Sequence, residues 1–189
     1  MAELEVLRAG YDQTVRLVEG LGAPDLLRPT PCQDWDVRAL LVHVVAATDG
    51  LVAMLHDEQP DWVGDGLGDD PAGAVRRSVT DALAAWAEPG ATDLPSQQMP
   101  GMRLVDFAMG DAIAHAWDLS AALGRPLVLE EDLARVVQGR WHGEPSRQGR
   151  AYGAFGPQVE VPADAPALHL FLGDVGRDPQ WGQGPTAQA

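Results

Sequence analysis

The sequence predicts an all-α protein whose core is a four-helix bundle, followed by a C-terminal extension. Four long segments repeat apolar residues at steps of three and four, and their ends carry residues typical of helix caps. A chain of 189 residues is long enough for one buried core and short for two. We therefore expect helices near residues 3–22, 36–56, 71–87 and 102–123.

The second predicted helix has the clearest start. Asp36 is its expected N-cap, with Trp35 just outside the helix and Leu40 one turn inside it as a hydrophobic staple. His43 borders the apolar stripe of this helix. His56 lies at the other end, where the helix dipole favours a cation, so we expect it to cap the helix.

The later helices are bounded by similar signals. Asp70 and Pro71 form a cap and first-turn pair, and Gly124 ends the fourth helix. Trp62 and Val63 are unusually apolar for the surface loop between the second and third helices. Either they clamp the end of the bundle or they form a lid over a pocket.

The last third of the chain shows no periodic core of its own. We expect it to form a short helix near 133–141, a loop over 143–156, an extended segment over 155–161 and a last helix near 166–175. The predicted organisation is a bundle over residues 1–125, an extension packed on it over 126–179 and a frayed tail over 180–189.

Composition limits the partners of this protein. The formal charge of −15 offers no basic surface for nucleic acid and would be repelled by an anionic membrane. We expect no apolar run to reach the length of a membrane span, about 18–20 residues, and the basic start of a secretory signal is missing. The single cysteine, Cys32, agrees with a reducing compartment. We expect a cytoplasmic protein, monomeric or homodimeric.

Two polar residues stand on the inward stripe of the fourth helix, where apolar residues belong. Asp111 and His115 are spaced i and i+4, so their side chains are neighbours on one helical face. A buried carboxylate needs a partner, and an Asp oxygen and a His nitrogen can converge on one metal ion. His43 is a plausible third ligand, and three protein ligands would leave a position for water or substrate. An Asp–His pair that shares a proton is the alternative.

Two sequence segments resemble the signatures of a known family. They are Thr30-Pro-Cys-Gln-Asp-Trp-Asp-Val-Arg-Ala-Leu-Leu-Val-His43 and Asp111-x-x-x-His115-x-Trp-Asp-Leu119, and the match extends to Phe155-Gly-Pro157 and Gly176-Arg-Asp-Pro179. The family is one of actinobacterial metal-binding proteins related to mycothiol-dependent maleylpyruvate isomerase, in the DinB-like superfamily of four-helix bundles. All 13 basic residues are Arg, a bias typical of G+C-rich coding sequence that fits such a source.

The resemblance implies a metal site and a class of chemistry. The family's ligands, a His in the first signature and an acidic residue plus His in the second, map onto His43, Asp111 and His115. Zn²⁺ suits two imidazoles and a carboxylate best, although Ni²⁺, Fe²⁺ or Mn²⁺ also fits. The related isomerase uses mycothiol and has Glu where this chain has Asp111, whose side chain is one methylene shorter.

Three functions remain open from the sequence. The first is a transferase or isomerase that uses a metal-bound thiolate, with a small thiol such as mycothiol and an electrophilic substrate as partners. The second is a protein that binds a metal or small molecule, for sequestration or resistance, without catalysis. The third is a metal-dependent hydrolase. No glycine-rich phosphate loop and no serine nucleophile motif is present.

Five further residues have candidate roles near such a site. Asp118 is expected to orient a ligand histidine by a hydrogen bond, or else to act as a base for hydrolysis. Arg140, Arg147 and Arg150 can hold a substrate carboxylate or a thiol cofactor, or simply face solvent. Cys32 is expected to be a small buried packing residue rather than a catalytic thiol.

Overall fold

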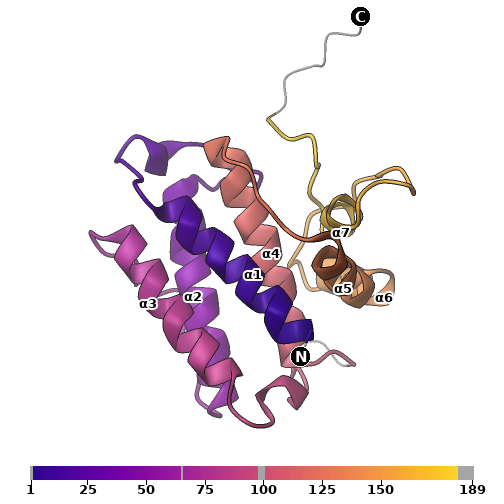
Figure 1. The fold of residues 1–189 in the computed structure, drawn as a ribbon, viewed down its shortest axis with the longest axis horizontal. Helices are drawn as coiled ribbons and strands as arrows, with labels where there is room; N and C mark the ends of the chain where they lie inside the picture. The colour runs from indigo at the N-terminus through magenta and orange to yellow at the C-terminus, as the bar shows by residue number, and fades with distance from the viewer. Residues whose placement is uncertain (1, 65, 98–100, 183–189) are drawn as a thin grey trace, which may run out of the picture.

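The structure is a computed structural model that describes residues 2–64, 66–97 and 101–182, and within these ranges it has seven α-helices and no β-strand. Helices α1 (Ala2–Val18), α2 (Val37–Leu55), α3 (Pro71–Trp86) and α4 (Leu104–Leu123) form a bundle (Figure 1). Helix α1 packs on α3 and α4, and α2 packs on the same two helices. The predicted all-α bundle is confirmed.

The helix boundaries follow from the predicted caps. The Asp36 carboxylate accepts a hydrogen bond from the Ala39 backbone N–H at 2.8 Å, and Asp70 accepts one from the Gly73 N–H at 2.9 Å. Each such cap stabilises its helix by about 1 kcal/mol. Gly124 ends α4 in the left-handed conformation, with φ of 64°.

Helix α4 is the central element of the fold. It packs on α1, α2 and the C-terminal helix α5 (Glu131–Trp141), so it is apolar on nearly every side. Its side chains Met109, Ile113 and Leu119 are at most 1% exposed, and burial of each stabilises the fold by about 1.5–3 kcal/mol. Polar residues on this helix therefore stand in the core of the protein.

The C-terminal extension consists of three short helices on the α4 side of the bundle, α5 (Glu131–Trp141), α6 (Glu144–Ala151) and α7 (Ala167–Asp174) (Figure 1). Trp141 anchors it. The Trp141 Nε1–H donates to the Asp106 carbonyl at 3.0 Å, and the indole lies on Gly110, where a Cβ atom would be 2.2 Å from Nε1. Only glycine at position 110 allows this approach.

Two expectations differ from the structure. The first helix ends at Val18 rather than near residue 22, because the chain turns at Gly20 with φ of 72°. The loop expected over 143–156 contains α6, which lacks an apolar stripe and begins with Pro145 in its first turn. Residues 183–189 of the expected tail lie outside the described residues.

The expectation that no apolar run reaches membrane-spanning length was wrong for α2. Among the described residues, Val37–Leu55 is one helix that is long and apolar enough to cross a membrane, judged by length and composition alone. Its mean hydropathy is 1.6. More than half of that window, 56%, is buried inside the protein, as in the core helix of a bundle. The length and apolar composition of α2 are therefore explained by its place in the core of the bundle.

Candidate metal centre

The loop before α2 brings two side chains to the face of α4. The Thr30 N–H donates to the Trp35 carbonyl at 3.1 Å, and Val37 N–H donates to the Arg28 carbonyl at 2.9 Å, which closes the loop at its base. As a result Trp35 lies against the ring of His43, with ring centroids 4.8 Å apart, and Cys32 reaches α4. Both residues belong to the sequence signature around residues 30–43.

His43, Asp111 and His115 lie together, as the sequence led us to expect. Asp111 Oδ1 is 3.6 Å from His43 Nε2 and 3.4 Å from His115 Nε2, and the two imidazole rings meet edge to face with centroids 4.7 Å apart. One candidate ligand atom from each residue lies within 4.8 Å of the other two. The three residues form a group that could hold a metal ion.

These distances are informative because they are too long for strong hydrogen bonds. A charge-assisted N–H···O bond to a carboxylate is about 2.7–2.9 Å long. In a tetrahedral zinc site with bonds of about 2.0–2.2 Å, neighbouring ligand atoms are about 3.3–3.6 Å apart. The spacings of Asp111 to the two histidines match the second geometry.

The electrostatics of this group are those of a carboxylate that needs positive charge. Burial by itself raises the pKa of Asp111, but the adjacent His115 and His43 outweigh burial and lower that pKa well below its usual value. Burial lowers the pKa of His115, whereas Asp111, Asp118 and Cys32 raise it well above its usual value. Positive charge at this position therefore offsets the free-energy cost of removing the Asp111 carboxylate from water.

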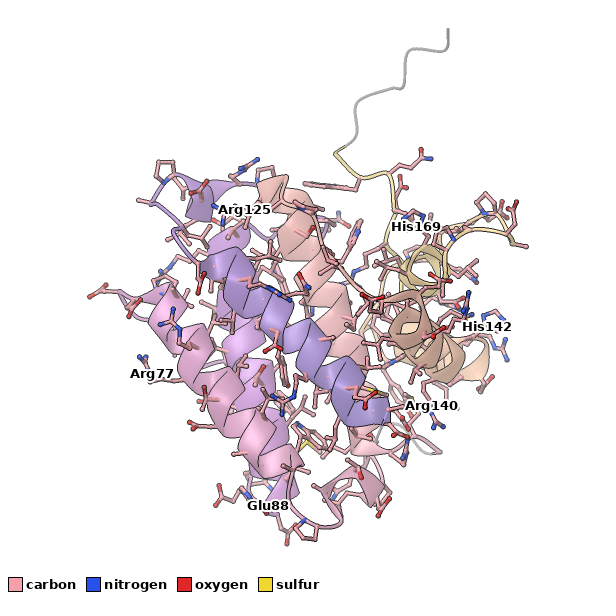
Figure 2. The ribbon with its side chains drawn as sticks, viewed as in Figure 1. Arg77, Glu88, Arg125, Arg140, His142 and His169 are labelled. Atoms are coloured by element: carbon pink, nitrogen blue, oxygen red, sulfur yellow. The ribbon has the colours of Figure 1, made fainter. Side chains whose placement is uncertain are left out.

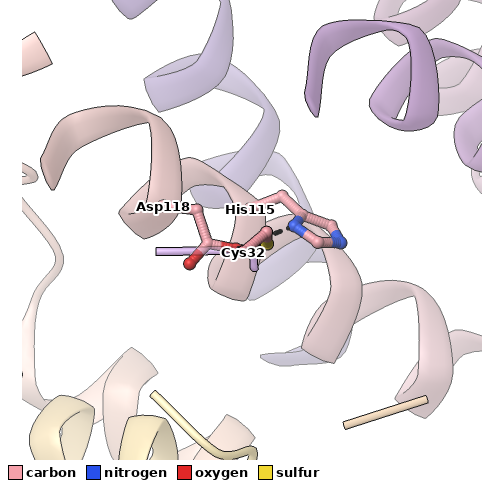
Figure 3. Close-up of side chains that lie close together, drawn as sticks. All are labelled: Cys32, His115 and Asp118. Carbon is pink, nitrogen blue, oxygen red and sulfur yellow. Dashed lines mark hydrogen bonds and ion pairs between the residues drawn. The ribbon is translucent and has the colours of Figure 1, made fainter. Parts of the chain in front are cut away.

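A second group of side chains lies on the other side of His115. Asp118 is fully buried, and its Oδ2 atom is 2.9 Å from His115 Nδ1 and 3.0 Å from Cys32 Sγ (Figure 3). By distance, Cys32, His115 and Asp118 also form a group that could hold a metal ion. The predicted hydrogen bond between Asp118 and His115 is present.

Arg177, from the segment after α7, completes this second group. Its Nε and Nη2 atoms donate to the two oxygens of Asp118 at 3.3 and 3.0 Å, and Nη2 lies 3.4 Å from Cys32 Sγ. Burial acts to raise the pKa of Asp118, but Arg177 and His115 lower it below its usual value. Cys32 packs against the core, as expected, but it is only half-buried and is hydrogen-bonded to Asp118.

Two cavities meet at His43. The first, of about 550 Å³, has His43, Asp111 and His115 in its wall together with Cys32 and Arg177. The second, of about 540 Å³, shares only Trp35 and His43 with the first and is bounded by Trp62 and Val63.

Trp62 combines features of both roles considered from the sequence. Its ring is fixed on α2, because a Cβ atom at Gly50 would lie 2.7 Å from the ring carbon Cζ3. It also lines the second cavity, which includes His43. Trp62 is thus clamped on the bundle and stands at the edge of the site.

The three candidate arginines of the extension do not line either cavity. Arg140 pairs with Glu3 and Asp106, Arg147 pairs with Glu144, and the Arg150 guanidinium donates to the Asp174 carbonyl at 2.6 Å. Figure 2 shows Arg140 and His142 on the α5 side of the molecule. His56 caps α2 and lies 3.7 Å from Glu88, away from the site.

Arg177 is the main site residue that sequence reasoning did not assign. It stands in the Gly-Arg-Asp-Pro segment near the C-terminus, which was noted only as part of the resemblance. The match of this Gly176-Arg-Asp-Pro179 segment was the signal that was available.

The fold and the clustered side chains define a helical-bundle protein with candidate metal ligands in its core. The chain belongs to the family described as the mycothiol maleylpyruvate isomerase N-terminal domain, whose model matches residues 7–120. The resemblance inferred from the sequence is therefore confirmed. Arg177 lies outside the matched range.

Known proteins support this assignment. Two uncharacterized proteins of Mycobacterium tuberculosis, MT0763 and Rv0738, are each 30% identical to this chain over 184 residues, which is 94% of this chain and 98% of theirs. The crystal structure of the mycothiol-dependent maleylpyruvate isomerase is similar with a TM-score of 0.61 over 94% of this chain and 79% of that chain. At 16% identity, this likeness shows a shared DinB-like fold.

Proposed function

We propose that this protein binds one divalent metal ion through His43, Asp111 and His115, and that it is a transferase or isomerase which activates a small thiol at that ion. The observation that carries the proposal is the spacing of 3.4 and 3.6 Å between the Asp111 oxygen and the two imidazole nitrogens. Zn²⁺ is the first candidate, and Ni²⁺, Fe²⁺ and Mn²⁺ suit the same ligands. The family name makes mycothiol the first thiol to test.

The neighbouring group of Cys32, His115 and Asp118 is less suited to an ion. Both Asp118 oxygens already accept hydrogen bonds from Arg177, whose pKa is raised further by that carboxylate. The guanidinium stays charged at any physiological pH and would repel a metal cation bound by the residues that it contacts. The distances of about 3 Å within this group mean that its members are already hydrogen-bonded to one another.

Asp118 gives His115 a defined orientation. Because its carboxylate faces Nδ1 at 2.9 Å, Asp118 favours a proton on that nitrogen, so that Nε2 is the nitrogen left to bind an ion once the ring is neutral. Asp118 is fully buried behind the ring. It is therefore a positioning residue here, and its pairing with Arg177 argues against the role of hydrolytic base.

An ion with three protein ligands keeps a position for a further ligand, and it lowers the pKa of a thiol that enters there. The cavity of about 550 Å³ beside the three residues offers the access and the room. Its volume falls in the range of about 300–1,000 Å³ that is typical of small-molecule sites.

The site is tested by metal analysis of purified variants. Asp111→Ala and His115→Ala should lose stoichiometric metal, whereas His56→Ala, which removes a histidine at the end of α2, should keep it. Full metal in the Asp111→Ala, His115→Ala double variant would refute the site.

The chemistry is tested with cobalt in place of the native metal. A small thiol should add an intense sulfur-to-cobalt charge-transfer band and release close to one proton per site, and the metal-free protein should do neither. Mycothiol should bind better than cysteine if the cavity recognises the rest of the molecule. If the cobalt stays bound and no thiol changes its spectrum, the thiol proposal fails and a binding protein or hydrolase becomes the leading interpretation.

A further inference from the structure

We infer that the cavity beside the ion ligands accepts an uncharged, flat aromatic group and discriminates against a dicarboxylate. This inference rests on the function proposed above and specifies the class of its electrophilic substrate. It follows from three features of the cavity: its aromatic surfaces, the pairing of its Arg177 with Asp118, and the small residues at its rim.

One aromatic surface is continuous with the ion ligands. Phe107 lies one helical turn before Asp111 on α4, so both side chains face the same cavity. The Phe107 ring packs on Trp141 with centroids 6.0 Å apart, and Trp141 meets Phe155 edge to face at 5.2 Å. Phe107 and Phe155 line the cavity, while Trp141 is 1% exposed behind them.

Phe155 is held in place from behind. A Cβ atom at Gly149 would lie 2.4 Å from the ring carbon Cε2, so the ring rests directly on the backbone of α6. Its position is fixed before any ligand arrives, and little side-chain entropy is lost on binding.

A second aromatic surface comes from the loop before α2. The Trp35 indole lies 4.8 Å from the ring of His43 and 6.2 Å from that of His115, measured between centroids. It lines the same cavity. A flat group next to the ion therefore has aromatic faces and edges within reach, the arrangement that favours stacked and edge-to-face contacts.

The charge of the lining does not suit a dicarboxylate. Among the described residues that line the cavity, Arg177 is the one arginine, and it donates two hydrogen bonds to the fully buried Asp118. To turn toward a substrate, Arg177 would have to leave that carboxylate buried without its partner. The formal charge of −15 also opposes the approach of a dianion.

The rim of the cavity is made of small residues that leave room for a ring. Gly153, Ala154 and Gly156 line it, and Gly176 packs so closely on this loop that its Cβ atom would be 2.8 Å from the Gly156 carbonyl oxygen. The rim is thus set by backbone contact between two loops of the extension.

The inference is tested with three thiols on the cobalt-loaded protein: benzyl mercaptan, mercaptosuccinate and 2-mercaptoethanol. All three offer a thiol sulfur, and mercaptosuccinate can in addition chelate the ion through its neighbouring carboxylate, so a preference for benzyl mercaptan appears against that advantage and reports on the cavity. Benzyl mercaptan should bind about tenfold to a hundredfold more tightly than mercaptosuccinate, from burial of its ring.

Variants assign this preference to the aromatic wall. Phe155→Ala should weaken benzyl mercaptan about tenfold and leave 2-mercaptoethanol unchanged. Tyr152→Ala is the matched control, because Tyr152 precedes Phe155 by three residues, is 65% exposed and does not line the cavity. Circular dichroism verifies that both variants are folded.

The outcomes separate this inference from the function on which it rests. Equal or tighter binding of mercaptosuccinate, or no effect of Phe155→Ala, overturns the aromatic preference and leaves the thiol function standing.

If no thiol alters the cobalt spectrum, the thiol function fails, and the cavity is tested with an aromatic ligand that has no thiol. In that measurement, intermolecular NMR contacts from benzyl alcohol to the Phe107 and Phe155 rings should appear and should resist competition by succinate; their absence overturns the inference.

Discussion

His115 separates two polar groups that are built from similar side chains and differ in their spacing. Toward Nε2, the Asp111 oxygen lies 3.4 Å from His115 and 3.6 Å from His43. Toward Nδ1, the Asp118 oxygen lies 2.9 Å from His115 and 3.0 Å from both Cys32 and Arg177. The first group has the spacing of ligands around an ion, and the second has the spacing of groups that bind each other.

This difference shows that residue types alone do not identify a metal site. Each group contains His115 and an aspartate within 4.8 Å of a third possible ligand. What distinguishes them is whether the carboxylate already has its hydrogen-bond donors. Asp118 has them, whereas Asp111 has two imidazoles at distances beyond a charge-assisted hydrogen bond.

The largest expected effect is on metal affinity. His43→Ala removes one of three ligands and should weaken metal binding by about a thousandfold or more. Cys32→Ala should change it by less than about threefold, because Cys32 belongs to the hydrogen-bonded group. Competition with a chromophoric chelator measures both. The reverse ranking would place the ion in the second group.

The next effect is on the stability of the metal-free protein. Asp118→Ala leaves the Arg177 guanidinium buried without its carboxylate and should lower the free energy of unfolding by about 3–5 kcal/mol. Asp111→Ala should cost less than about 1 kcal/mol, because His115 can lose its proton when Asp111 is gone. Urea unfolding in the presence of a chelator compares the two; equal losses would contradict the distinction between the groups.

A smaller effect is expected from Asp118→Asn, which keeps the shape of the side chain. It should weaken metal binding about 10- to 100-fold through the altered hydrogen bond to His115. Asp174→Asn is the matched control, since Asp174 is likewise buried and lies 2.9 Å from a histidine Nδ1, that of His142, in the extension. If the two variants bind metal equally, Asp118 has no positioning role.

The smallest effect is the dependence of stability on pH. Because the folded protein lowers the pKa of Asp118, this carboxylate stabilises the fold at pH values above its unfolded pKa of about 3.9, and the contribution is lost as pH falls below it. The free energy of unfolding of the metal-free protein should therefore decline from pH 5 toward pH 3, and Asp118→Asn should reduce that slope. Urea titrations at several pH values give both slopes, and identical slopes would argue against the shifted pKa.

Local signals made the bundle predictable. The Asp36 and Asp70 caps and the Gly124 stop act within a few residues of one another, so their consequences could be stated before the structure. Helix α6 could not be found in the same way, because its residues carry charge pairs such as Glu144 with Arg147 but no apolar stripe.

The candidate site was only partly predictable for a related reason. The spacing of Asp111 and His115 and the family resemblance indicated three candidate ligands, but the distances among them depend on how α2 and α4 pack. The contact of Arg177 with Asp118 joins segments 59 positions apart in the sequence, and no periodicity reports such a pair. The sequence therefore named the side chains around His115 without showing which carboxylate was already paired.

The pairing of Arg177 with Asp118 also sets an order of events during synthesis. All three candidate ion ligands lie before the end of α4 at Leu123, whereas Arg177 follows α7. Translation at about 5–20 residues per second places several seconds between these two points. The growing chain thus carries all three candidate ligands, and Asp118 as well, before it carries Arg177, which lines the same cavity and pairs with Asp118.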